Sequence, residues 1–283
     1  TMILFRQRPA LVISAGICIL LICIALIAPW LAPYDPTAGN LLDRLMPPFW
    51  QEGGSLQYLL GTDVLGRDIL SRLLYGARIS LAVCLISIAI AAVIGSTLGI
   101  IAGYMGGWVE SIIMRLVDIA VSLPAILLAL LFGVLFGPSF SNIIIIIGFL
   151  LWSQFARMAR GETLKVKQND YIDLARTAGC SSLDIMFRHV LPNVAASLII
   201  LATLQVGTVI IIEASLSFLG VGVPPPTAAW GSMIAEGRSY VISAWWIAMF
   251  PGMAIMFTVI AANVLGDELT DLINPALRNE IGI

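Results

Sequence analysis

Charged side chains are scarce in this sequence. Only 11% of the 283 residues are Asp, Glu, Lys or Arg, whereas soluble domains average about a quarter. The chain has two lysines, Lys165 and Lys167, and a single histidine, His189. This composition excludes an ordinary soluble domain, and the 59% hydrophobic content indicates a protein whose solvent is lipid.

Motifs for catalysis are missing as well. The sequence has no G-x-x-x-x-G-K-[ST] segment, so it lacks the usual loop for ATP phosphates. It also has no H-E-x-x-H segment and no nucleophile elbow, which argues against an intramembrane enzyme. The four cysteines show no metal-ligand spacing, and Cys18 and Cys23, five residues apart on one expected helix, are badly placed for a disulfide. We expect no catalytic residue, metal site or cofactor site in this chain.

Long apolar runs without charge are what the sequence has instead. A helix that crosses the hydrocarbon core needs about 20 apolar residues. The runs predict an all-α polytopic membrane protein with six spans, at about residues 9–33, 79–104, 112–136, 141–157, 193–213 and 244–266. Gly137-Pro138-Ser139 separates the third span from the fourth, because this triplet interrupts a run too long for one helix.

A further apolar run, residues 214–235, is not expected to span. It contains Gly220, Gly222 and the triplet 224–226 of three prolines, which a straight spanning helix would not carry. Non-helical backbone at membrane depth must be packed in protein or wet. The sequence leaves open whether this run lies outside the membrane or is partly folded back among the helices.

The positive charges predict an orientation. Six spans place both termini on one side, and most of the 15 lysines and arginines lie in segments on that side. An excess of positive charge marks the cytoplasmic side. This predicts cytoplasmic termini at residues 1–8 and 267–283, a cytoplasmic loop at 158–192 and a periplasmic loop at 34–77.

Residues 170–189 predict two short helices joined by a glycine, a segment that we call the elbow. Asn169 or Asp170 can cap the first helix, and Gly179 suits the left-handed position after its end. Ser181 can start the second helix, with Asp184 three residues later. The apolar positions of this second helix fall on one face: Leu183, Met186, Phe187 and Val190.

An elbow of this kind could simply connect two spans. A connection needs only a few residues, however, and a long structured loop more often presents a surface to a partner. We therefore favour docking over mere connection.

The elbow also carries a specific resemblance. The pattern Asp173-x-Ala175-x-x-x-Gly179, with Pro192 thirteen residues beyond the glycine, resembles the EAA loop of ABC importer permeases. This chain differs by having Asp173 for the usual Glu and Leu174 for the first Ala. Segments 59–81, 213–237 and 245–278 are similar to permeases of dipeptide, oligopeptide and nickel importers, and segment 47–63 is closer to the dipeptide type.

The resemblance implies a function, partners and a location. The chain would be a permease subunit of an ATP-driven importer in the bacterial inner membrane, not catalytic itself. Together with a second homologous permease it would form the path for short peptides, with nickel, glutathione or another small solute as alternatives. Two ATP-binding subunits would hold the ATP and Mg, and a periplasmic substrate-binding protein would deliver the solute. Lipid surrounds such a chain, and no nucleic acid is implied.

In that family the elbow is the coupling helix, which sits in a groove of the ATPase subunit. The residues expected to make this contact or act as its hinge are Tyr171, Asp173, Ala175, Arg176, Gly179, Phe187 and Pro192. For Arg176, the alternative interpretation, a solvated side chain without a role in the contact, is equally favoured. For Phe187, packing against the spans is the favoured one.

Polar residues in the spans are candidates for the translocation path: Glu213, Gln205 and Asn263. For Glu213, the favoured alternative is a carboxylate that caps a short helix at the membrane boundary. Asp118 is expected to form a local ion pair with Arg115.

Arg67, Asp68 and Trp230 are candidates for docking the binding protein. Arg67 and Asp68 precede an apolar stripe in residues 69–77, which could also form a helix lying on the membrane surface. The small residues Gly95, Gly99 and Gly103 have the spacing of a helix-packing face, which could seat a helix of this chain or of the partner permease.

A self-contained secondary transporter is the main rival interpretation. Such proteins usually show internal repeats and an ionisable or broken-helix site at the midplane. The two halves of this sequence show no repeat and no buried pair of carboxylates, and the rival gives the elbow no purpose.

Overall fold

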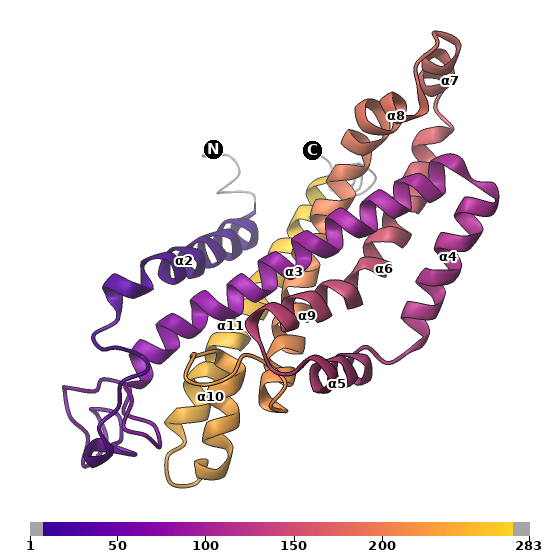
Figure 1. The fold of residues 1–283 in the computed structure, drawn as a ribbon. Helices are drawn as coiled ribbons and strands as arrows, with labels where there is room; N and C mark the ends of the chain where they lie inside the picture. Colours follow the sequence, from indigo (N-terminus) through magenta and orange to yellow (C-terminus); the bar gives the residue numbers. More distant parts are fainter. Residues whose placement is uncertain (1–7, 274–283) are drawn as a thin grey trace.

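The computed structural model describes residues 8–273 and is almost entirely helical there (Figure 1). Within that range, the helices long and apolar enough to cross a membrane singly are α2 (Pro9–Leu31), α3 (Ile69–Met105), α6 (Phe140–Lys167), α9 (Leu191–Phe218) and α11 (Trp246–Ile273). Helices α4 (Gly107–Ser122) and α5 (Ala125–Phe136) meet the same requirement only as a pair. The all-α polytopic class is confirmed, with five candidate spans within the described residues, or six if this bent pair is counted as one.

Short elements occupy the two ends of the bundle. At one end, which we call the elbow side, lie α7 (Asp170–Thr177) and α8 (Ser182–Ile185), followed by a π-helical turn, Met186–Val190. At the other end, the loop side, lie residues 32–68 with a 3₁₀ turn at Leu41–Asp43, then α10 (Trp230–Gly237) and a second 3₁₀ turn at Arg238–Tyr240. Residues 1–7 and 274–283 lie outside the described range, and the side that each terminus faces stays a prediction.

Helix α3 begins ten residues before the predicted span. The Asp68 carboxylate accepts a hydrogen bond from the Ser71 backbone N–H at 2.8 Å and so caps the first turn. Ile69 is fully buried, so residues 69–77 are not a helix lying on the membrane surface. That alternative is wrong, because the stripe packs inside the bundle as the first turns of α3.

The third predicted span, 112–136, is not one straight helix. Its two halves, α4 and α5, meet at an angle of 88°. Leu123 is extended, as expected for a residue before proline, and Pro124 offers no N–H to continue the helix. The Ser122-Leu123-Pro124 break lies inside an apolar run, where hydropathy alone does not reveal it.

Small residues bring α3 and α6 into the closest helix packing of the bundle. A Cβ atom added at Gly95 would lie 2.7 Å from the Phe155 Cβ atom, and one added at Gly103 would lie 2.8 Å from the Thr163 Cβ atom. The small-residue stripe therefore seats a helix of this chain, which decides between the two alternatives that the sequence left open.

Replacing Gly99 by alanine tests this packing. A Cβ atom there would clash with the backbone oxygen of Ala156 and lie 2.7 Å from the Ala159 Cβ atom. We expect Gly99→Ala to destabilise the chain by about 1–3 kcal/mol, measured by thermal unfolding in detergent. Gly252→Ala is the control, because a Cβ atom there would meet no atom within 4 Å. Equal melting temperatures for the two variants would contradict the packing.

The apolar run 214–235 is partly folded back among the helices. Helix α9 continues to Phe218, and the chain turns at Gly220, whose φ of 85° favours glycine. Helix α10 then packs against α9 and α11, with Trp230 and Met233 buried (Figure 1). The run is thus packed against the helices, and whether it lies outside the membrane stays a prediction.

Candidate functional site

The elbow has the local structure that its sequence predicts. Gly179 has a φ of 85°, its N–H donates to the Arg176 carbonyl at 3.0 Å, and the Cys180 N–H donates to the Ala175 carbonyl at 3.1 Å. This pair of bonds is the Schellman ending of a helix. Asn169 occupies the cap position of α7, although its side chain makes no capping bond.

The second arm starts where the sequence places it. The Ser181 hydroxyl accepts from the Asp184 N–H at 3.2 Å and donates to the Asp184 carboxylate at 2.8 Å. The following π-helical turn has a bond from the Leu191 N–H to the Met186 carbonyl, five residues back. Pro192 lies directly after the π-helical turn, near the start of α9. Because no break separates α8 from α9, the second arm is joined directly to a spanning helix.

The elbow buries one set of apolar residues and exposes another. Ile172 and Ile185 are buried and hold the two arms on the bundle. Leu174 and Phe187 are 69% and 66% exposed at the far end of the molecule. The single apolar face predicted for the second arm therefore divides, with Met186 and Val190 inside and Leu183 and Phe187 outside.

Exposed apolar side chains on a well-folded projection mark an interaction surface. Phe187 is partly exposed and borders a hollow beside Ile100 and Ile101 of α3, so both its packing role and its contact role stay predictions. Leu174 and Leu183 are also exposed elbow residues. The sequence-based set did not include them, because Leu174 stands where the family has alanine.

The remaining predicted contact residues are arranged around a brace to α3. Arg176 forms an ion pair with Asp173 at 3.1 Å, and its guanidinium lies 5.3 Å from the centre of the Tyr104 ring at the end of α3. Lys167 donates to the Tyr104 carbonyl at 2.8 Å. Arg176 is therefore more than a solvated charge, since it ties the first arm to α3. Tyr171 is exposed and Ala175 is half-buried.

Two of the three path candidates are buried inside the chain. The Glu213 carboxylate accepts from Ser80 at 3.1 Å and from Ser217 at 2.8 Å, and it is fully buried between α3 and α9. It lies inside α9, so its predicted role as a cap at the membrane boundary is wrong. Gln205 is buried and donates to Gln154 of α6.

Asn263 is the exposed path candidate. Its side chain lies on α11, facing Gly207 of α9. The three path candidates therefore do not share one surface of the chain.

The three docking candidates are buried. Trp230 is 1% exposed and donates from Nε1 to the Leu73 carbonyl at 3.0 Å, and Asp68 is the α3 cap. Arg67 donates from Nε to Asp63 Oδ2 at 2.6 Å and from Nη2 to Glu236 Oε2 at 2.8 Å. In this conformation these side chains hold the loop side together and cannot reach a docked protein.

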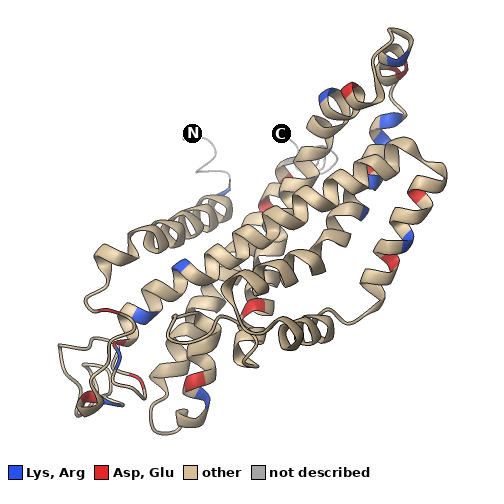
Figure 2. Cartoon of the chain, in the orientation of Figure 1, with Lys and Arg blue, Asp and Glu red and all other residues tan. Residues whose placement is uncertain are grey.

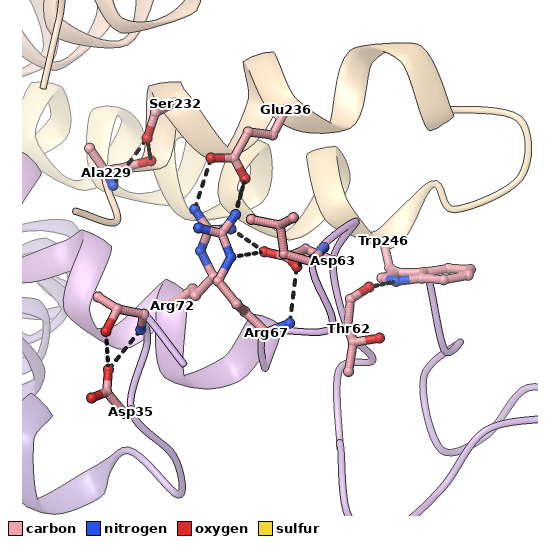
Figure 3. Close-up of polar contacts among 11 residues, drawn as sticks. Asp35, Thr62, Asp63, Arg67, Arg72, Ala229, Ser232, Glu236 and Trp246 are labelled. Carbon is pink, nitrogen blue, oxygen red and sulfur yellow. Dashed lines mark hydrogen bonds and ion pairs between the residues drawn. The ribbon is translucent and has the colours of Figure 1, made fainter. Parts of the chain in front are cut away.

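The Arg67 contacts belong to a four-residue ion network, shown in Figure 3. Arg72 pairs with Asp63, and its Nη1 lies 2.7 Å from Glu236 Oε2. The network joins the loop 32–68, α3 and α10 with two positive and two negative charges (Figure 3). Glu236 is absent from the sequence-based candidates, because its partners lie more than 160 residues away in the chain.

Other charges hold α4 to α6. Arg157 pairs with Asp118 at 3.0 Å, and the Arg160 Nε donates to Glu110 at 2.8 Å. The expected pair of Asp118 with Arg115 is wrong, because the bundle brings Arg157 to that carboxylate instead. Figure 2 shows how few charges lie along the helices between the two ends.

Within residues 8–273, no group of three or more His, Cys, Asp or Glu side chains is placed to hold a metal ion. A bundle of apolar helices with a folded polar projection defines a membrane-embedded component that can receive another protein at one end. The elbow is therefore a candidate docking site for a partner protein.

Comparison with known proteins assigns the family. Residues 95–279 match the family described as "Binding-protein-dependent transport system inner membrane component", and residues 2–48 match the "N-terminal TM domain of oligopeptide transport permease C". The chain belongs to this family of binding-protein-dependent inner membrane permeases, as the sequence resemblance predicted.

Individual relatives are similar in sequence to this chain over nearly its whole length. The di/tripeptide transport system permease protein of Pseudomonas aeruginosa is 43% identical, over 92% of this chain and 86% of its own. The dipeptide transport system permease protein of Escherichia coli is 43% identical over 97% and 91%. The glutathione transport system permease protein of Salmonella paratyphi A is 42% identical over 97% and 89%.

Proposed function

We propose that this permease, paired with a second homologous permease, forms the membrane path of an importer for short peptides. In this proposal two ATP-binding subunits hold ATP and Mg, and a periplasmic binding protein delivers the peptide. The elbow lies on the cytoplasmic side, as do both termini, and the loop side is periplasmic. The observation that carries the proposal is the folded elbow, which offers exposed apolar side chains at one end of a chain without an ATP site of its own.

The elbow is built to transmit movement. Its first arm follows α6 directly and is braced to α3 through Arg176 and Tyr104, and its second arm continues into α9. An ATPase that binds the elbow can therefore move three spanning helices at once. Such a switch requires the ATPase to bind the two conformations with different affinity, which ATP-driven closure of an ATPase pair would supply.

Short peptides are the proposed cargo because the relatives are named for dipeptides and di/tripeptides. Glutathione is a second candidate, since a relative named for its transport is 42% identical over 97% of the chain. Uptake of a radiolabelled dipeptide and of glutathione by the assembled complex decides between them.

Copurification tests the role of the elbow. We expect the tagged wild-type chain to bring down an ATP-binding subunit and a second permease from membranes. Gly179→Pro should lose the ATP-binding subunit alone, because proline cannot adopt a φ of 85° and has no N–H for the Arg176 carbonyl. Gly179→Asn is the control, since asparagine tolerates the left-handed conformation.

Two results would contradict this proposal. A wild-type chain that purifies alone and moves solute into liposomes without ATP would show a secondary transporter. Retention of the ATP-binding subunit by Gly179→Pro would remove the elbow from the coupling role.

A further inference from the structure

A hollow of about 790 Å³ opens between the bent pair α4–α5 and helix α6. Its volume is in the range of sites that hold small molecules. One wall is the bend, residues 120–125, and the opposite wall is one side of α6 from Leu150 to Lys165. Leu201 of α9 adds to the lining, and Figure 1 shows α4 spread away from α6 at this level.

The α6 wall of the hollow is polar. Ser153, Gln154, Arg157, Glu162 and Lys165 all line the hollow. Their spacing puts them on one half of the helix, while residues such as Phe155 and Ala159 on the other half pack on α3. This wall therefore offers polar and charged groups to water or to a polar occupant.

The opposite wall supplies backbone groups. At the break between Ser122 and Ala125 helical hydrogen bonding is interrupted. The Ser122 hydroxyl donates to the Ile119 carbonyl, and the Pro124 carbonyl accepts from the Leu127 N–H. Pro124, in the cap position, gives the first N–H groups of α5 no side-chain cap, and such N–H groups complement the carbonyls of a peptide backbone.

The charges around the hollow come in both signs. Arg157 lies across from Asp118, at 3.0 Å, and Lys165 lies 2.7 Å from Glu162. Arg157 and Lys165 are 55% and 74% exposed, so neither cation is held as firmly as in a buried pair. A small zwitterion can exchange with both partners of such a pair, since it offers a carboxylate to the cation and an ammonium to the anion.

We propose that this hollow is a transit site for zwitterionic short peptides within the permease. The peptide carboxylate binds Arg157 or Lys165, the ammonium group binds Asp118 or Glu162, and the bend contacts the peptide backbone. Gln154 lines the hollow and accepts a hydrogen bond from Gln205, so this amide pair joins the site to α9 and hence to the elbow. The inference rests on the proposed function in peptide import.

Gly161 makes the site testable without disturbing the fold. It lines the hollow, and a Cβ atom added there would meet no atom within 4 Å. Gly161→Trp should fill the site and lower peptide uptake by the assembled complex at least tenfold, with copurification of the partner subunits unchanged. Gly16→Trp on α2 is the matched control, since a Cβ atom there also meets no atom within 4 Å, and its uptake should equal wild type.

A second measurement needs no transport. In the purified complex, labelling of Gly161→Cys by a thiol reagent should be slowed by alanyl-alanine and not by N-acetyl-alanyl-alanine amide, which lacks both charges. The parent chain with Gly161 intact gives the background labelling of the native cysteines.

The outcomes separate this inference from the proposed function. Unchanged uptake by Gly161→Trp, or labelling that alanyl-alanine does not slow, overturns the transit site and leaves peptide import standing. Loss of the partner subunits from Gly161→Trp also overturns it, because the hollow would then hold another subunit. If the wild-type complex takes up no peptide, peptide import fails and the labelling result alone decides the site.

Discussion

Arg72→Met is expected to destabilise the chain by about 3–5 kcal/mol, because it breaks a buried ion network from one side. Arg72 is 1% exposed and contacts both Asp63 and Glu236. Without it two carboxylates share only Arg67, and a buried charge left without a partner is far more costly than a lost surface pair. Thermal unfolding in detergent, followed by size-exclusion chromatography, measures the loss.

Two further variants isolate the cause. Arg78→Met removes an exposed arginine from the same helix, six residues further on, and should change stability by less than about 0.5 kcal/mol. The double variant Arg72→Met with Glu236→Gln restores the balance of charge and should recover part of the lost stability. Equal loss in Arg72→Met and Arg78→Met would mean that the network does not hold the loop side together.

Phe187→Asp is expected to abolish ATP-dependent uptake by releasing the ATP-binding subunit. The side chain is 66% exposed, so the chain itself should fold and insert normally. Burial of the new charge in an apolar contact would weaken binding by at least about 2 kcal/mol, roughly 30-fold. The affinity of the purified permease pair for the ATP-binding subunits, measured by surface plasmon resonance, gives this number.

Ile242→Asp is the matched control for that experiment. Ile242 is a fully exposed apolar residue at the opposite, loop-side end of the chain. It should leave the binding of the ATP-binding subunits unchanged. The coupling proposal fails if Phe187→Asp and Ile242→Asp bind equally well, or if Phe187→Asp keeps ATP-dependent uptake.

Local sequence patterns predicted the spanning helices and the elbow. Charge-free runs mark helices that lipid can surround, and the Gly179 and Ser181 signals specify a helix end and a helix start through bonds within a few residues. Such features depend on neighbouring residues alone, and the elbow's helix end and helix start appear in the structure where the sequence places them.

Features that depend on residues far apart in the sequence could not be predicted from local patterns. Nothing near Arg67 in the sequence indicates that Glu236 will pair with it, so Arg67 was predicted to be available for docking. Glu213 looked like a boundary residue because its serine partner Ser80 comes from another helix. The bend at Pro124 was not predicted, because the hydropathy of an apolar segment is the same whether its helix is straight or bent.

Helix α3 is about 55 Å long at 37 residues, whereas the hydrocarbon core is about 30 Å thick. One end carries Arg72 and the loop-side ion network, and the other carries Tyr104, against which the elbow is braced. A single unbroken helix bends little along its length, so a tilt at one end also moves the other end. In the importer proposed above, α3 would carry movement between the loop side, where cargo would arrive, and the elbow, where an ATP-binding subunit would bind.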